Sequence, residues 1–76
     1  MKHRQADLAF RIREVREDLY GEYGAQFLAD ALDLPLRTWM NYERGVVIPA
    51  EVILKLIETT RVSPCWLLTG RGPKYD

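Results

Sequence analysis

The feature that most constrains the fold is a short segment, residues 32–45, with the sequence LDLPLRTWMNYERG. Pro35 suits the first turn of a helix, because its fixed φ and missing N–H cost nothing there. Gly45 stands where a left-handed residue commonly ends a helix. The segment therefore predicts a helix over about residues 35–44. Residues 24–32 predict another short helix directly before it, so two short helices must pack across a tight turn.

Three further helices are predicted around this pair. Upstream, apolar residues recur at spacings of four, three and four, which is the pattern of one helix face, and this helix ends near Gly21. Pro49 opens a fourth helix, and Ser63 followed by Pro64 is a typical start of a fifth, which ends at Gly70. We therefore predict an all-α fold. The positions expected to face its core are Leu8, Ile12, Val15, Leu19, Leu28, Ala29, Leu32, Trp39, Tyr42, Val52, Ile53, Leu56, Ile57, Trp66 and Leu67.

Length and composition predict one small domain, residues 1–76. Hydrophobic residues make up 47% of the chain, which is enough for one compact core. The single cysteine, Cys65, and the single histidine, His3, exclude a disulfide framework and a histidine/cysteine zinc site. A lone thiol favours a reducing cytoplasm. The N-terminus leads into an amphipathic helix, which predicts neither a signal peptide nor a transmembrane span, so we expect a cytoplasmic protein.

The sequence offers no arrangement typical of an enzyme. A catalytic site needs a base, a nucleophile or a metal held in a pocket, and a core this small leaves little concavity. A glycine-rich phosphate loop is also missing. The acidic residues Glu14, Glu17 and Asp18 are interpreted as a solvated helix face. We therefore expect no enzymatic activity, no cofactor, no metal and no small-molecule ligand.

Two segments resemble the Xre/Cro/C1-type helix-turn-helix family of phage and bacterial repressors. Residues 32–45 fit the family's pattern of hydrophobic residue, turn, recognition helix and Tyr-Glu-x-Gly exit. Residues 62–72, VSPCWLLTGRG, are similar to the fifth helix of the phage C1 repressor subgroup. The resemblance covers roughly residues 8–72. It implies a compact five-helix, lambda-repressor-like domain, with the helix-turn-helix over about residues 24–44 and helix five with the tail over 63–76.

The resemblance implies a sequence-specific regulator of transcription, a repressor that binds double-stranded DNA with its recognition helix in the major groove. The side chains suit that role, because Arg37 can donate two hydrogen bonds to guanine and Asn41 can pair bidentately with adenine. Apolar groups at Leu36 or Met40 can touch a thymine methyl. The residues implied to contact DNA are Gln26, Leu36, Arg37, Thr38, Met40, Asn41 and Arg44, of which Arg44 reaches a phosphate.

Two further features follow from the resemblance. Arg16 of the first helix is expected to pair with Glu43 at the end of the recognition helix, as a structural tie. One such module buries only ~600–1,000 Å² on DNA, so tight binding needs a homodimer on an inverted-repeat operator. Residues 63–76 are the expected dimer surface.

Other features favour an alternative function, in which the same fold is a protein-interaction module, antitoxin-like or a phage regulatory adaptor. The chain has 11 basic and 11 acidic residues, whereas DNA affinity depends largely on neutralising phosphates. Gly24 and Ala25 replace the polar pair that usually begins the second helix of the family, and Gln26 is only a partial substitute. The loop of residues 46–48 has no basic residue. DNA binding in the groove should weaken steeply as salt rises, and an apolar protein interface should not.

Two aromatic residues, Phe10 and Phe27, fall outside the apolar helix faces. We expect them to pack on each other or on Tyr23, the alternative being a small contact surface for a partner. Cys65 is expected to be an inert thiol in the fifth helix.

Overall fold

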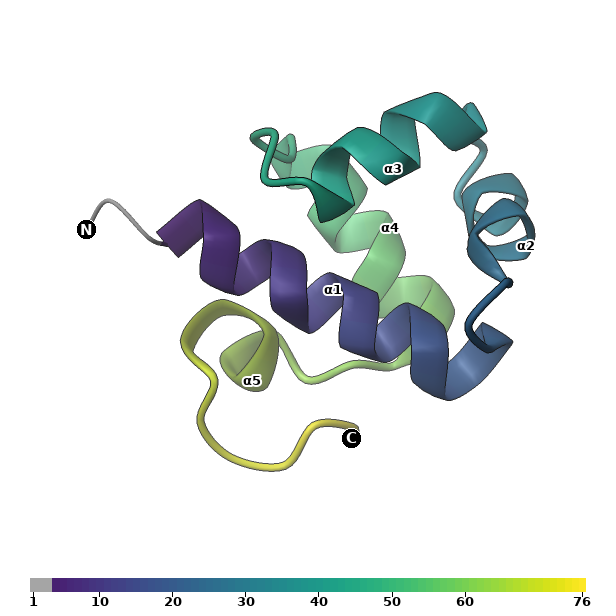
Figure 1. Ribbon diagram of the computed structural model, residues 1–76. Coiled ribbons are helices and arrows are strands. Elements are labelled where there is room, and N and C mark those ends of the chain that lie inside the picture. Colours follow the sequence, from purple (N-terminus) through teal and green to yellow (C-terminus); the bar gives the residue numbers. More distant parts are fainter. Residues whose placement is uncertain (1–3) are drawn as a thin grey trace.

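The computed structural model describes residues 4–76, so His3 lies outside the described part of the chain. The elements are five α-helices, and the described residues form no strand (Figure 1). The all-α, five-helix expectation is therefore confirmed. The helices are α1 (Arg4–Tyr20), α2 (Ala25–Ala31), α3 (Leu36–Glu43), α4 (Ala50–Thr60) and α5 (Pro64–Thr69).

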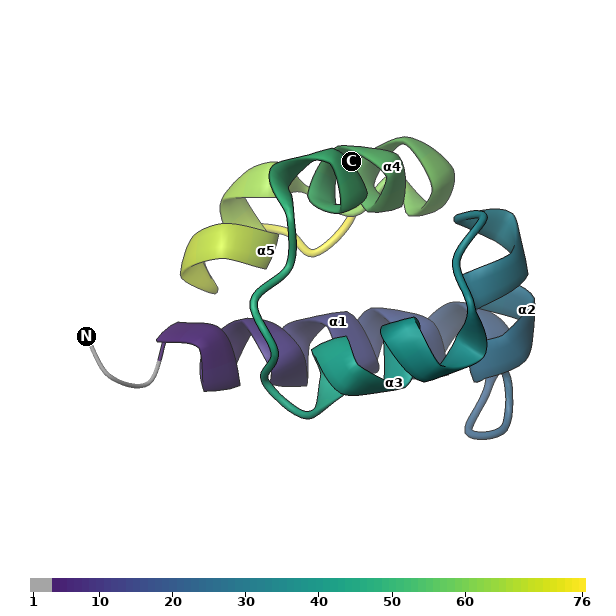
Figure 2. The ribbon, with the colours of Figure 1, turned by 90° about the horizontal axis from the view of Figure 1, so that it is seen from above.

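The longest helix, α1, is the centre of the arrangement. In Figure 1 it lies between α3 and α5, and Figure 2 shows α4 and α5 together on the side of α1 away from α3. Trp39 of α3 is fully buried between these helices, and its ring meets the ring of Tyr42 edge-on, with centroids 6.4 Å apart. Such a pair adds about 0.5–1.5 kcal/mol beyond area burial. The core also contains Ile12, Val15, Leu28, Ala29, Leu32, Val52, Leu56, Val62 and Leu67.

The helix ends follow the expected signals with one addition. The hydroxyl of Ser63 accepts a hydrogen bond from the Trp66 N–H at 3.4 Å, so Ser63 is the N-cap of α5 as expected. Gly70 ends α5 with a φ of 78°, and Gly45 follows α3 with a φ of 105°. Arg61 ends α4 in the left-handed region, with a φ of 64°. Because this residue is not a glycine, the sequence carries no signal for the end of the helix here.

Gly24 is the N-cap of α2, and its lack of a side chain matters for a steric reason. A Cβ at this position would collide with the carbonyl oxygen of Tyr20 and with the Tyr20 Cβ. The residue allows the end of α1 to approach the start of α2. Gly24 is thus more than the replacement of a polar residue at the start of the helix, because no side chain fits at this position.

Several apolar residues expected to be covered are exposed. Leu19, in the last turn of α1, is 47% exposed and is therefore not part of the core. Phe10, Phe27 and Tyr23 are 67%, 68% and 91% exposed, so the expectation that these rings pack together is wrong. Phe10 and Phe27 belong to helices that other side chains hold in the core, Tyr23 lies in the turn between α1 and α2, and all three rings are on the surface.

Candidate functional site

The site expected from the sequence is α3, which has two different faces. Trp39 and Tyr42 point into the core, as expected. The other face carries Leu36, which is 38% exposed, together with the exposed side chains of Arg37 and Arg44. The remaining residues implied to contact DNA from this helix, Thr38, Met40 and Asn41, are half-buried.

The two faces arise from the helical period. Positions 36, 37, 40, 41 and 44 recur on one side of a helix with 3.6 residues per turn. They form a continuous strip, hereafter the outer face of α3 (residues 36, 37, 40, 41 and 44). The strip has apolar, cationic and amide groups within two turns.

The end of α3 is fixed to α1 by a buried ion pair. Arg16 donates from Nε to Oε2 of Glu43 at 3.0 Å and from Nη2 to Oε1 at 2.7 Å. The indole Nε1 of Trp39 donates to the same carboxylate at 2.5 Å. The side chains of Arg16 and Glu43 are only 6% and 4% exposed, and the hydrogen bond to Glu43 raises the pKa of Arg16 above its usual value. The pair expected from the sequence thus lies between the two helices.

Arg16 also holds the chain segment between α1 and α2. Its Nη1 donates to the carbonyl oxygens of Gly21 and Glu22, at 3.2 and 2.7 Å. One guanidinium therefore connects α1, the following turn and α3. This arrangement fixes how the outer face of α3 is presented, without using any side chain of that face.

Polar contacts on the outer face are few. Nη1 of Arg44 donates to Oδ1 of Asn41 at 3.2 Å, and this oxygen has a second lone pair for another donor. The side-chain Nδ2 of Asn41 can donate at the same time. Arg37 has no ion-pair partner among residues 6–76. The outer face of α3 therefore offers a partner the N–H donors of Arg37, Arg44 and Asn41, and one acceptor, the Asn41 Oδ1.

Acidic side chains lie on α2, the helix that precedes α3, and directly after it. Gln26, expected to contact DNA, is exposed, and its Nε2 donates to Oδ1 of Asp30 at 2.8 Å. Asp33, in the turn between α2 and α3, is also exposed and has a φ of 61°. The carboxylates of Asp30 and Asp33 repel a phosphate backbone, and the Gln26 side chain already donates a hydrogen bond to that of Asp30.

The tail does not provide a basic group beside α3. Lys74 forms an ion pair with Glu14 and a second with Asp18, the latter at 2.8 Å, and the hydroxyl of Tyr75 donates to Asp18 at 2.8 Å. Glu14 and Asp18 are exposed, as expected for a solvated helix face, and each also forms an ion pair with Lys74. Glu17, the third acidic residue of this face, is exposed as well.

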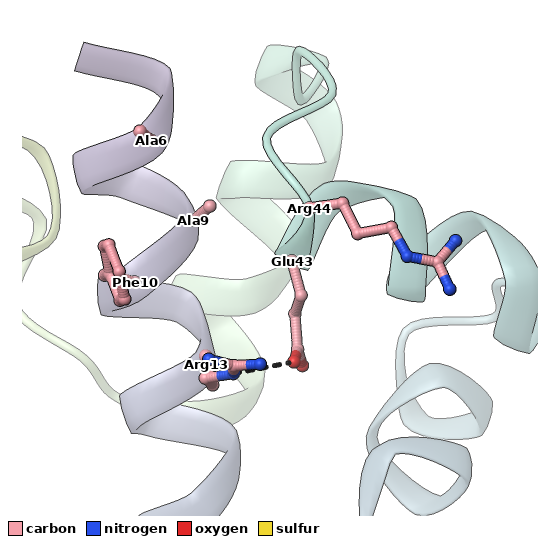
Figure 3. A pocket seen from close by; sticks show the side chains of 6 residues that line it. All are labelled: Ala6, Ala9, Phe10, Arg13, Glu43 and Arg44. Carbon is pink, nitrogen blue, oxygen red and sulfur yellow. Dashed lines mark ion pairs between the residues drawn. The ribbon is translucent and has the colours of Figure 1, made fainter. Parts of the chain in front are cut away.

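One feature near α3 was not expected from the sequence. An open pocket of about 190 Å³ lies between the first half of α1 and the end of α3 (Figure 3). Its apolar lining includes Phe10, and Arg13 stands at its mouth. Neither residue belongs to a sequence motif, and both lie near Glu43 only because α1 packs against α3.

None of the helices in the described part of the chain is long and apolar enough to cross a membrane. Comparison of the chain with protein-family models, with curated proteins and with solved structures finds no match.

Proposed function

We propose that this chain is a sequence-specific DNA-binding regulator of transcription, a repressor of the Xre/Cro/C1 helix-turn-helix type. In this proposal α2 and α3 are the helix-turn-helix, and α3 lies in the major groove. The observation that supports it best is the outer face of α3, whose exposed side chains include groups able to hydrogen-bond to bases. The buried ion pair of Arg16 and Glu43 holds α3 from behind.

Each side chain of the outer face has a suitable partner on DNA. Arg37 is exposed and can donate two hydrogen bonds to guanine O6 and N7. Asn41 can pair with adenine N6 and N7 while Arg44, which contacts its Oδ1, reaches a phosphate. Leu36, which is exposed, supplies an apolar group for a thymine methyl, and so does the exposed part of Met40, which also packs against the core.

The proposal includes a homodimer. A single module of this size buries ~600–1,000 Å² on DNA, which is too little for tight specific binding. Two copies related by a two-fold axis would place two α3 helices in successive major grooves, ~34 Å apart. The operator is then an inverted repeat with half-site centres about 10 base pairs apart. The proposed contact between the copies is α5.

The first test is selection of bound sequences from random double-stranded DNA, followed by fluorescence anisotropy at two salt concentrations. We expect an enriched inverted repeat whose affinity falls as salt rises. The slope should be clearly negative but less steep than for a more basic DNA-binding face, because each phosphate contact contributes about −0.9 to it and α3 has few basic neighbours. A well-folded chain that enriches no sequence would contradict the proposal.

Substitution of the two base-reading residues tests the register. Arg37→Ala and Asn41→Ala should each weaken operator binding by ~1–3 kcal/mol and relax the preference at one position of each half-site. Arg61→Ala is the matched control, since Arg61 is an exposed arginine at the end of α4, outside both the outer face of α3 and residues 63–76. Parental affinity in both α3 variants would show that a different face binds DNA.

A second candidate function rests on the apolar part of the same region. Leu36 is 38% exposed, and Val46 and Val47 in the loop after α3 are 53% and 61% exposed. An interface for a protein partner would cover such groups, as in an antitoxin-like module or a phage regulatory adaptor. Binding that persists at high salt, together with no selected DNA sequence, would favour this function.

A further inference from the structure

The pocket between α1 and α3 has an apolar floor and a charged rim. Ala6 and Ala9 leave the hollow because their side chains are small, and Phe10, which is 67% exposed, forms a wall. The carboxylate of Glu43 and the side chain of Arg13 complete the rim (Figure 3). An aromatic wall beside a cationic rim suits a ligand with both a ring and a negative charge.

The charges at the rim do not balance. Glu43 provides one carboxylate, and both Arg16 and Arg13 face it. Arg16 occupies both oxygens, at 2.7 and 3.0 Å, and Trp39 donates to one of them as well. Nε of Arg13 lies 3.8 Å from Oε1, too far for a hydrogen bond. The carboxylate is therefore satisfied without Arg13, and one positive charge is in excess.

Arg13 is the cation that a molecule in the pocket would meet. Its side chain is 52% exposed, so its guanidinium remains open to a second partner. In Figure 3 the guanidinium of Arg44 points away from the pocket, so Arg44 lines it with its stem. Arg16 is buried behind Glu43 and cannot be reached.

We propose that this pocket binds a small aromatic carboxylate, with the ring against Phe10 and the alanines and the carboxylate on Arg13. The size agrees, because a cavity of ~150 Å³ can hold a benzene ring and this pocket measures about 190 Å³. Guanidinium and carboxylate form paired, charge-assisted hydrogen bonds. Two rings gain further stability by offset or edge-on contact. The site does not depend on whether the outer face of α3 binds DNA.

The test is a titration of the full chain with phenylacetate, followed in two-dimensional amide NMR spectra. Phenylacetate should shift the amide signals of the pocket lining saturably. Acetate, which lacks the ring, and phenylacetamide, which lacks the charge, should each bind at least ~10-fold more weakly. Signals that never saturate, or equal binding of phenylacetamide, would overturn the proposal.

Two variants locate the site, each with a matched control. Arg13→Gln removes the excess charge, and Ala6→Leu fills the hollow from an exposed helical position. Both should reduce phenylacetate binding at least ~10-fold while the thermal unfolding midpoint stays near the parental value. Arg71→Gln and Ala31→Leu make the same changes at exposed positions outside the pocket and should bind normally. Loss of binding in Arg71→Gln with normal binding in Arg13→Gln would place the ligand elsewhere and refute the proposal.

Discussion

A single carboxylate decides how α3 is held. Glu43 accepts hydrogen bonds from Arg16 and from the indole of Trp39, and its side chain is 4% exposed. Burial of a charge is costly unless the charge is paired and hydrogen-bonded, and here both conditions are met. Substitution of Glu43 therefore measures how much of the free energy of unfolding depends on this buried ion pair.

Glu43→Gln should destabilise the fold by about 3–5 kcal/mol, because it leaves the guanidinium of Arg16 buried without its counter-charge. Urea unfolding followed by tryptophan fluorescence would measure the change. Glu58→Gln, at an exposed position of α4, makes the same substitution without this burial and should cost less than about 0.5 kcal/mol. A similar loss in the two variants would show that the buried pair adds nothing to stability.

Residue positions and contacts could be predicted from the sequence where the helical period or the family resemblance indicates them. Core positions such as Trp39 and Tyr42 follow from the helical period, and the pairing of Arg16 with Glu43 followed from the resemblance. The excess charge at Arg13 could not be predicted, because it depends on how closely α1 and α3 approach. The exposure of Phe10 and Phe27 was also missed, since a ring outside an apolar face does not reveal whether another element covers it.

At the scale of elements, the tail that follows α5 lies across α1. Lys74 and Tyr75 of this tail, hereafter the strap, contact Glu14 and Asp18 of α1. The backbone of the strap pairs with the start of α5, since the Ser63 N–H donates to the carbonyl oxygen of Lys74 at 2.7 Å, and Tyr75 forms a β-bridge with Val62. The Lys74 ammonium lies 5.3 Å from the centre of the Trp66 ring. None of these contacts could be read from the sequence, because each joins residues whose proximity depends on the complete fold.

The strap should make stability depend on pH at both extremes. The hydrogen bond from Lys74 lowers the pKa of Asp18 below its ordinary 3.8, so the contribution of Asp18 is present above that pH and is lost as the pH falls through the folded value. Burial, aided by Asp18, raises the pKa of Tyr75 from 10.0 to about 12. The contribution of Tyr75 is therefore complete below pH 10 and is lost as the pH rises toward 12.

The difference in unfolding free energy between the parent and Asp18→Asn isolates the acidic part of this dependence. It should be constant near neutral pH and shrink as the pH falls below 4, because the parental carboxyl becomes protonated. Asp18 is more than a third exposed, so the difference should be small. A difference that does not change with pH would mean that the carboxylate charge plays no part in the strap.

The junction of α1 and α2 gives a second prediction for an element. Gly24→Ala should destabilise the fold although alanine favours helices, because the new Cβ would collide with the backbone of Tyr20. Relief of that collision must separate α1 from α2, and we expect a cost of ~1–3 kcal/mol from this overpacking. Gly21→Ala offers a contrast, since its Cβ meets open space and only its φ of 86° is unfavourable. Thermal unfolding of both variants would separate steric from conformational cost, and an unchanged or higher midpoint for Gly24→Ala would contradict the steric explanation.

For the whole molecule, balanced charge does not mean an even distribution of charge. Lys74 is paired with Glu14 and Asp18 on the α5 side of α1, whereas Arg37 and Arg44 are on the outer face of α3. The proposed DNA face thus carries two exposed cations, whereas Lys74 on the α5 side is neutralised by its two ion pairs. A neutralised side that also exposes an apolar residue is better suited to contact with a second copy than to contact with DNA.

The proposed homodimer can be tested with two leucines of equal exposure. Leu68 of α5 is 54% exposed and Leu54 of α4 is 56% exposed, so each can be changed to glutamate with similar effect on the monomer. If α5 is the contact between copies, Leu68→Glu should place two carboxylates in one apolar interface and shift the chain to monomer, as measured by sedimentation equilibrium. Because a monomer contacts only one half-site, the same variant should also lose most of its affinity for the full inverted repeat and keep its preference within a half-site. Leu54→Glu should leave both the mass and the affinity unchanged. Equal mass for the parent and both variants would refute association through α5.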